Sequence, residues 1–117
     1  MTDEFSANRY QNLAMRTCNF DLRQADRSDM VCHAVFGLTS EAGEVAGLFQ
    51  KWYQGHELDE EHLMKEIGDC LWMIAELCTA YGFSLEDVMQ LNIDKLRARY
   101  PDGFDTEKSL HRAEGDV

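Results

Sequence analysis

The sequence of 117 residues predicts an all-α protein, a four-helix-type bundle of one domain. Apolar residues recur at spacings of three and four along several segments, which is typical of amphipathic helices. The single proline, Pro101, leaves room for long uninterrupted helices, and no segment shows the alternation expected of a strand. We expect the helical domain to cover residues 1–105 and a polar, loose tail to cover residues 106–117.

The first two helices are expected over residues 3–18 and 30–52. The first has only a modest apolar stripe. A polar stretch over residues 19–28 separates the two, and the acidic residues at its end are suited to starting a helix. The second has a continuous apolar stripe, and Gly55 is well placed to end it.

The third helix is expected over residues 59–81, with Asp59 as its N-cap and Gly82 just beyond its C-terminus. The fourth begins after Ser84, which resembles an N-capping residue. It must end near residue 100, because Pro101 disfavours helical geometry at the residue before it. The short connections suit antiparallel neighbours in a bundle.

The net charge of −11 argues against binding to a nucleic-acid polymer or to an anionic membrane. No apolar stretch is long enough to span a bilayer, and residues 1–6 do not resemble a signal peptide. The four cysteines form no C-x-x-C pair, so zinc-site spacing is absent. We therefore expect a cytoplasmic protein with reduced thiols.

Two acid-x-x-acid pairs are the most informative feature of the sequence. Glu41 and Glu44 form the first pair, and Glu66 and Asp69 form the second. Each pair shares a helix face with apolar residues three or four positions away. Partly buried carboxylates facing one another would be unstable unless they became protonated or bound a cation.

Oxygen ligands without His or Cys favour Mg²⁺ or Mn²⁺, so the two pairs predict a divalent metal site. The simpler interpretation is that these acids belong to a solvated surface. A sequence with only one acid-x-x-acid pair would favour that interpretation. A di-iron site would need Glu-x-x-His, which neither pair provides. Gly43, Gly47 and Gly68 lie beside the acids, and we expect them to allow close approach of a helix or a ligand.

A metal site in an acidic protein suggests phosphate as the other metal ligand. Asn92, Lys95 and Arg99 share one face of the fourth helix and could hold a triphosphate, with Lys51 adding a further charge. The alternative is a basic stripe that only complements the helix dipole. Trp72 is a candidate for stacking on a base, although aromatic residues at helical spacing commonly belong to the core.

The segments SEAGEV (residues 40–45) and KEIGDCLW (residues 65–72) resemble the E-x-x-E … E-x-x-D signature of the MazG-like nucleotide pyrophosphohydrolases. The segment from Asn92 to Phe104 is similar to the small, phage-type, single-domain members. The resemblance covers roughly residues 10–112. It implies an all-α hydrolase that forms homodimers or homotetramers and cleaves nucleoside triphosphates, often deoxynucleotides, into monophosphate and pyrophosphate. Clearing of the nucleotide pool is an expected role.

By position in this resemblance, Glu41, Glu44, Glu66 and Asp69 are the expected metal ligands and catalytic residues. Asn92, Lys95 and Arg99 are the expected phosphate contacts, and Lys51 is a weaker correspondence. Ser40 stands where some members have a further acid, which leaves the general base open. Two alternatives remain: a non-catalytic helical dimer that binds nucleotides or another protein, and a pyrophosphohydrolase that acts on a phosphoribosyl nucleotide.

Overall fold

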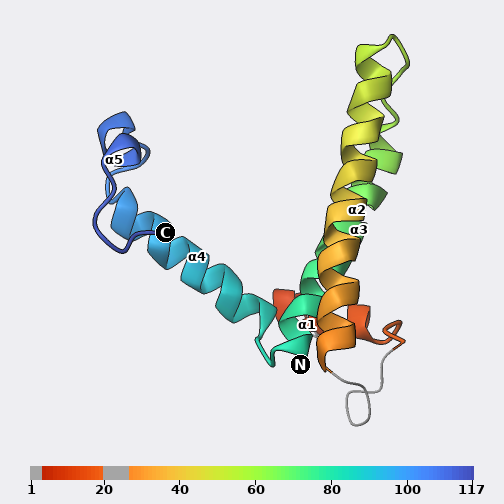
Figure 1. The fold of residues 1–117 in the computed structure, drawn as a ribbon, viewed down its shortest axis with the longest axis horizontal. Helices are drawn as coiled ribbons and strands as arrows, with labels where there is room; N and C mark the ends of the chain where they lie inside the picture. Colours follow the sequence, from red (N-terminus) through yellow and green to blue (C-terminus); the bar gives the residue numbers. More distant parts are fainter. Residues whose placement is uncertain (1–3, 20–26) are drawn as a thin grey trace. The chain divides into compact units, whose positions relative to one another are not determined.

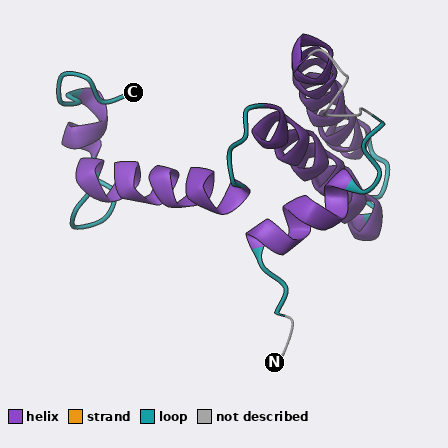
Figure 2. Ribbon diagram, turned by 90° about the horizontal axis from the view of Figure 1, so that it is seen from below, coloured by secondary structure: helices purple, strands orange, loops and turns teal. Residues whose placement is uncertain are grey.

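The computed structural model describes residues 4–19 and 27–117, and every regular element in these ranges is a helix. Figures 1 and 2 show this all-helical chain. The predicted all-α class is confirmed. The chain divides into two units, residues 1–84 and 85–117.

Helix α1 (Ala7–Met15) is shorter than predicted, because its N-cap is Ser6, whose side chain accepts a hydrogen bond from the backbone N–H of Arg9. Helix α2 (Arg27–Tyr53) is longer than predicted by three residues at its start. Most of the expected polar connection, residues 20–26, lies outside the described residues. Gly55 follows α2 with a positive φ of 107°, as expected of a residue that ends a helix.

Helix α3 (Glu60–Ala80) matches its prediction closely. Asp59 is the N-cap and accepts a hydrogen bond from the backbone N–H of His62 at 3.1 Å. Gly82, with φ of 71°, turns the chain after the helix. Both ends of α3 are therefore defined by the residues that the sequence indicated.

Helices α2 and α3 form a hairpin and lie side by side in Figures 1 and 2. Met30 and Ala34 of α2 and Ala75 of α3 are almost fully buried. Gly37 lies against the side chain of Met73, and a Cβ at this position would require the flexible Met73 thioether to move. Among the glycines of the described residues, Gly37 is therefore the one that packs directly against a side chain of the neighbouring helix.

A polar network joins α1 to the hairpin. The fully buried Glu76 contacts His33 Nδ1 at 2.6 Å and accepts a hydrogen bond from Cys18 Sγ. Trp72 donates its indole N–H to Ala14 O and Thr17 Oγ1, each at 3.0 Å. These bonds hold the end of α1 and the residues that follow it against α3.

The second unit contains helix α4 (Leu85–Arg99) and the short helix α5 (Thr106–Leu110). The tail was expected to be loose, but Asp105 caps α5 by accepting hydrogen bonds from two backbone N–H groups. Arg99 also forms two hydrogen bonds with Asp116. Capping and ion pairing therefore order a segment whose composition is polar.

Many large apolar side chains of the first unit are exposed. Phe36 and Met64 are 70% and 72% exposed, and Trp52 and Tyr53 are also exposed near the end of α2. Over the parts of the chain that the structure describes, every helix is too short or too polar to cross a bilayer. One chain by itself leaves extensive apolar surface in contact with water.

Candidate metal centre

Three of the four predicted acids meet between α2 and α3. Glu41 of α2 and Glu66 and Asp69 of α3 each place a carboxylate oxygen within 4.8 Å of the others. The offset of three residues puts Glu66 and Asp69 on one face of α3, and the antiparallel hairpin brings Glu41 opposite them. Two adjacent helices therefore present carboxylates toward one another at three of the four positions.

The surroundings of Glu41 disfavour its charged form. Its partial burial raises the pKa of this carboxyl, and the neighbouring carboxylates of Asp69, Glu66 and Glu44 raise the pKa further. A hydrogen bond with Glu66 acts in the same direction, because the protonated Glu41 is its donor. Glu44 is exposed and lies outside the group of three, although it is near enough to affect Glu41.

Two residues beside the cluster were not predicted to have a role there. His62 Nε2 lies 3.0 Å from Glu66 Oε1, one helical turn away on α3. The Tyr10 hydroxyl of α1 donates to Gly68 O at 3.4 Å, and burial together with the Asp69 charge raises the pKa of Tyr10. The spacing of four between His62 and Glu66 was a usable signal in the sequence. The contact with Tyr10 depends on how α1 packs, which the sequence does not specify.

The donor set fits a hard divalent cation. Three carboxylates from two helices supply only oxygen atoms, the ligands that Mg²⁺ and Mn²⁺ prefer. A cation would also offset the repulsion that raises the pKa of Glu41. Glu41, Glu66 and Asp69 could therefore hold such an ion, with Glu44 close to it.

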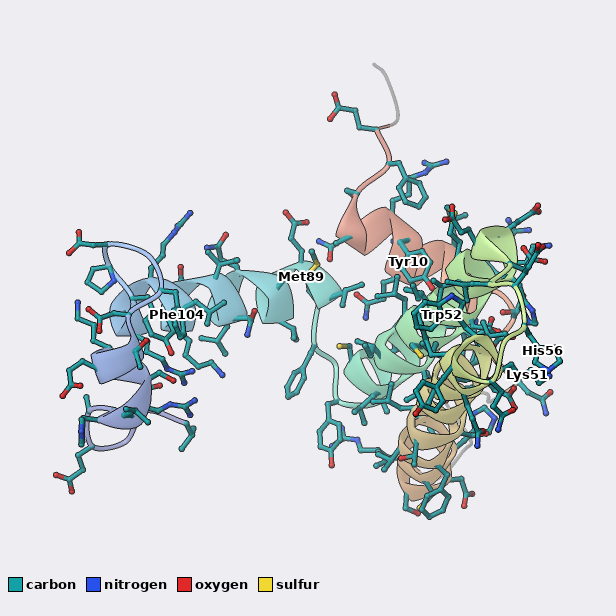
Figure 3. The ribbon with its side chains drawn as sticks, turned by 90° about the horizontal axis from the view of Figure 1, so that it is seen from above. Tyr10, Lys51, Trp52, His56, Met89 and Phe104 are labelled. Atoms are coloured by element: carbon teal, nitrogen blue, oxygen red, sulfur yellow. The ribbon has the colours of Figure 1, made fainter. Side chains whose placement is uncertain are left out.

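Lys51 lies near the C-terminal end of α2, away from these carboxylates. It is ten residues beyond Glu41, which corresponds to about 15 Å along a helix. His56 donates its backbone N–H to Lys51 O at 3.0 Å, so both belong to the turn that ends α2 (Figure 3). Within one chain, the structure does not bring Lys51 to the acidic cluster.

Trp72 lies one turn after Asp69 on α3, but its indole N–H is donated to Ala14 of α1 and to Thr17 just beyond it. Its ring contacts His33 edge to face, with a centroid distance of 6.2 Å. The structure thus gives Trp72 a packing function between helices. Stacking on a base stays a prediction.

The predicted phosphate contacts Asn92, Lys95 and Arg99 all lie on α4, in the second unit. Arg99 is engaged there, because its Nε and Nη2 atoms each donate to an Asp116 carboxylate oxygen at 2.8 Å. This pairing lowers the pKa of Asp116. No spacing in the sequence indicates this pair, because Arg99 belongs to α4 and Asp116 lies after α5.

The glycines beside the acids have open surroundings. A Cβ added at Gly43, Gly47 or Gly68 would meet no atom within 4 Å. The expected close approach of another helix is therefore wrong within one chain, since α2 and α3 make that contact at Gly37. The space remains available to a ligand or to a second chain.

Comparison with known proteins places these residues in a family context. The family model for the MazG nucleotide pyrophosphohydrolase domain matches residues 33–104, a range that contains all four predicted acids. Gene 37 protein of Mycobacterium phage L5 is 29% identical over 79 residues, covering 63% of this chain and 69% of that protein. The uncharacterized protein YvdC of Bacillus subtilis (strain 168) is 36% identical over 73 residues, covering 54% and 69%. No solved structure matches the chain.

Proposed function

Because the chain belongs to the MazG nucleotide pyrophosphohydrolase family, we propose that it hydrolyses nucleoside triphosphates, with deoxynucleotides preferred, to monophosphate and pyrophosphate with the help of Mg²⁺. The observation that carries this proposal is the convergence of Glu41, Glu66 and Asp69 between α2 and α3. The family supports nucleotide pyrophosphohydrolysis in general. The identity of the metal as Mg²⁺ and the preference for deoxynucleotides go beyond what the family supports and are part of the proposal.

Glu41, Glu66 and Asp69 hold the ion in this proposal, and Glu44 completes the set from its exposed position one turn along α2. Bound Mg²⁺ would supply Lewis-acid chemistry by withdrawing charge from phosphoryl oxygens and acidifying water. His62 orients the Glu66 carboxylate through their 3.0 Å contact. Glu41 or Glu44 orients the attacking water toward the α-phosphorus.

Asn92, Lys95 and Arg99 serve as contacts for the leaving pyrophosphate in this proposal. They share one face of α4, where two cations and an amide can neutralise and hydrogen-bond phosphate oxygens. Lys51 and Trp72 remain candidates for further contacts with the triphosphate and the base. The distance of Lys51 from the acids of its own chain favours a contribution to the site of a second copy.

We include a homodimer or homotetramer in the proposal. The exposed Phe36 and Met64 side chains support it, since oligomer interfaces remove such apolar surface from water. The open space at Gly43 and Gly47 leaves α2 able to approach another chain closely. A second chain would also provide further residues to enclose a bound nucleotide.

The test is a panel of deoxynucleoside and ribonucleoside triphosphates, together with a phosphoribosyl nucleotide, incubated with purified protein and Mg²⁺. Phosphorus NMR identifies the products. We expect monophosphate and pyrophosphate from triphosphates, and no turnover in EDTA. Nucleotide binding without turnover would instead support the non-catalytic alternative, and release of orthophosphate would place the cleaved bond elsewhere in the triphosphate.

A further inference from the structure

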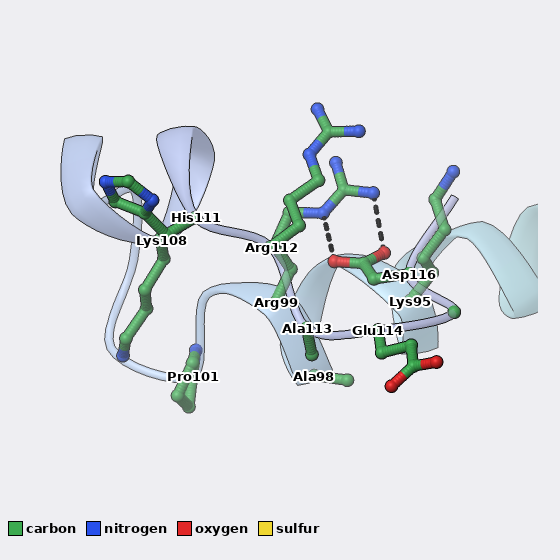
Figure 4. Close-up of a pocket in the computed structure, with 11 residues that line it drawn as sticks. Lys95, Ala98, Arg99, Pro101, Lys108, His111, Arg112, Ala113, Glu114 and Asp116 are labelled. Carbon is green, nitrogen blue, oxygen red and sulfur yellow. Dashed lines mark hydrogen bonds and ion pairs between the residues drawn. The ribbon is translucent and has the colours of Figure 1, made fainter.

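A pocket of about 670 Å³ lies within the second unit, between α4 and the segment that follows α5 (Figure 4). Its walls are unusually basic for a chain of net charge −11. Four of the eleven Lys and Arg residues line it, together with one histidine: Lys95, Arg99, Lys108, Arg112 and His111. Such a concentration of positive charge in an acidic protein favours an anionic ligand.

One anion already occupies the basic wall. The Asp116 carboxylate accepts hydrogen bonds from Nε and Nη2 of Arg99, both at 2.8 Å, as the dashed lines in Figure 4 show. The side chains of Arg99 and Asp116 are only 9% and 16% exposed. Lys95 and Arg112 are also close enough to stabilise the charge of Asp116.

The edge of the Arg99 guanidinium that contains Nε and Nη2 presents two parallel N–H groups. Such a pair of donors matches a carboxylate and a phosphate equally well. A phosphate oxygen pair cannot use the Nε–Nη2 edge of Arg99 while Asp116 holds it. A tethered carboxylate also acts at an effective concentration on the order of millimolar. Any free phosphate ligand must therefore displace it.

We propose that Asp116 is an internal competitor for phosphate in this pocket, so that residues 111–117 form an autoinhibitory strap over Arg99. Binding of a pyrophosphate-bearing ligand releases the strap from Arg99. Removal of the Asp116 carboxylate opens the pocket in the same way. The inference rests on the proposed function in one respect: Lys95 and Arg99 are assigned there to phosphate binding. The new element is Asp116, which controls whether Arg99 is available to phosphate.

The experiment measures binding of inorganic pyrophosphate to the full chain by calorimetry in EDTA, without turnover. We expect Asp116→Asn to bind pyrophosphate about tenfold more tightly than the unchanged chain, because a charge-assisted competitor is removed. Glu114→Gln is the matched control. This substitution also removes one negative charge from the pocket lining, but it leaves the Asp116 partner of Arg99 in place. The pyrophosphate affinity of Glu114→Gln should therefore stay within about twofold of that of the unchanged chain.

A chain ending at Gly115 should reproduce the gain of Asp116→Asn if that variant folds poorly. The gain should disappear in an Arg99→Gln background. Equal pyrophosphate affinities for Asp116→Asn and Glu114→Gln would overturn the inference. Absence of pyrophosphate binding in all variants would also overturn it. Hydrolysis is measured separately, so lost turnover with a retained Asp116→Asn gain would reject only the proposed reaction.

Discussion

At the residue scale, the candidate site depends on Glu41, whose neighbours make its negative charge unfavourable. Glu66 and Asp69 face it across the hairpin, and Glu44 adds further negative potential along α2. The sequence predicted these four positions because their spacing and apolar neighbours were visible. It could not predict that Glu44 would remain exposed, since that depends on how α2 is rotated against α3.

The first prediction concerns the stability of the metal-free protein. The raised pKa of Glu41 means that its ionised form destabilises the fold at pH 7, so Glu41→Gln should raise the melting temperature in EDTA. The same substitution should reduce the further rise caused by Mg²⁺, because one ligand is lost. Thermal denaturation with EDTA or Mg²⁺ measures both effects, and a lower melting temperature in EDTA would contradict the electrostatic interpretation.

A second prediction concerns the buried Glu76, which is fully enclosed and bonded to His33 and Cys18. Glu76→Ala should lower the free energy of unfolding by about 2 kcal/mol or more, because polar partners lose their bonds and a cavity opens. Urea denaturation measures this change. Glu61→Ala, at an exposed α3 position, is the control and should change stability by about 0.5 kcal/mol or less.

At the element scale, helix positions could be predicted well where capping residues and apolar periodicity agree. Asp59 and Gly82 define α3 for this reason. Helix α5 was missed because its order comes from the Asp105 cap in a polar segment with little apolar periodicity. The sequence also did not indicate that Gly37, and not Gly43 or Gly47, lies against α3, because sequence does not reveal which glycine faces the neighbouring helix.

The third prediction compares two glycines of α2. Gly43→Ala should stabilise the isolated chain by about 1 kcal/mol, since alanine favours helix and nothing lies within 4 Å of the new Cβ. Gly37→Ala should be less stable than Gly43→Ala, because its Cβ forces the Met73 thioether out of its place. Chemical denaturation provides the comparison. Equal stabilisation by both substitutions would show that the Gly37 contact does not limit packing.

The fourth prediction concerns the pH dependence of the strap. Arg99 lowers the pKa of Asp116 below the usual 3.8, so the ion pair stabilises the tail above that pH. This contribution should be lost only as the pH falls through the lowered pKa. The Nε–H signal of Arg99 in ¹⁵N NMR reports the pair. Loss of the bonded signal above pH 4 would contradict the assignment, and Asp116→Asn serves as the control without this titration.

At the scale of the whole molecule, the sequence predicted an all-α protein and the structure confirms that class. Family membership follows from the match over residues 33–104. Assembly could not be derived from periodicity alone, because an apolar stripe does not reveal whether its partner is the same chain or another copy. The exposure of Phe36 and Met64 now gives a physical reason to expect another copy.

The central claim is that Glu41, Glu66 and Asp69 hold a divalent cation, and Mn²⁺ binding measured by electron paramagnetic resonance tests it most directly. The full chain should bind Mn²⁺, and Mg²⁺ should displace it. Glu66→Gln should weaken binding by about tenfold or more. Glu61→Gln, an equal charge change at an exposed position of α3, should leave it nearly unchanged. Equal Mn²⁺ affinities for Glu66→Gln and Glu61→Gln would contradict the account.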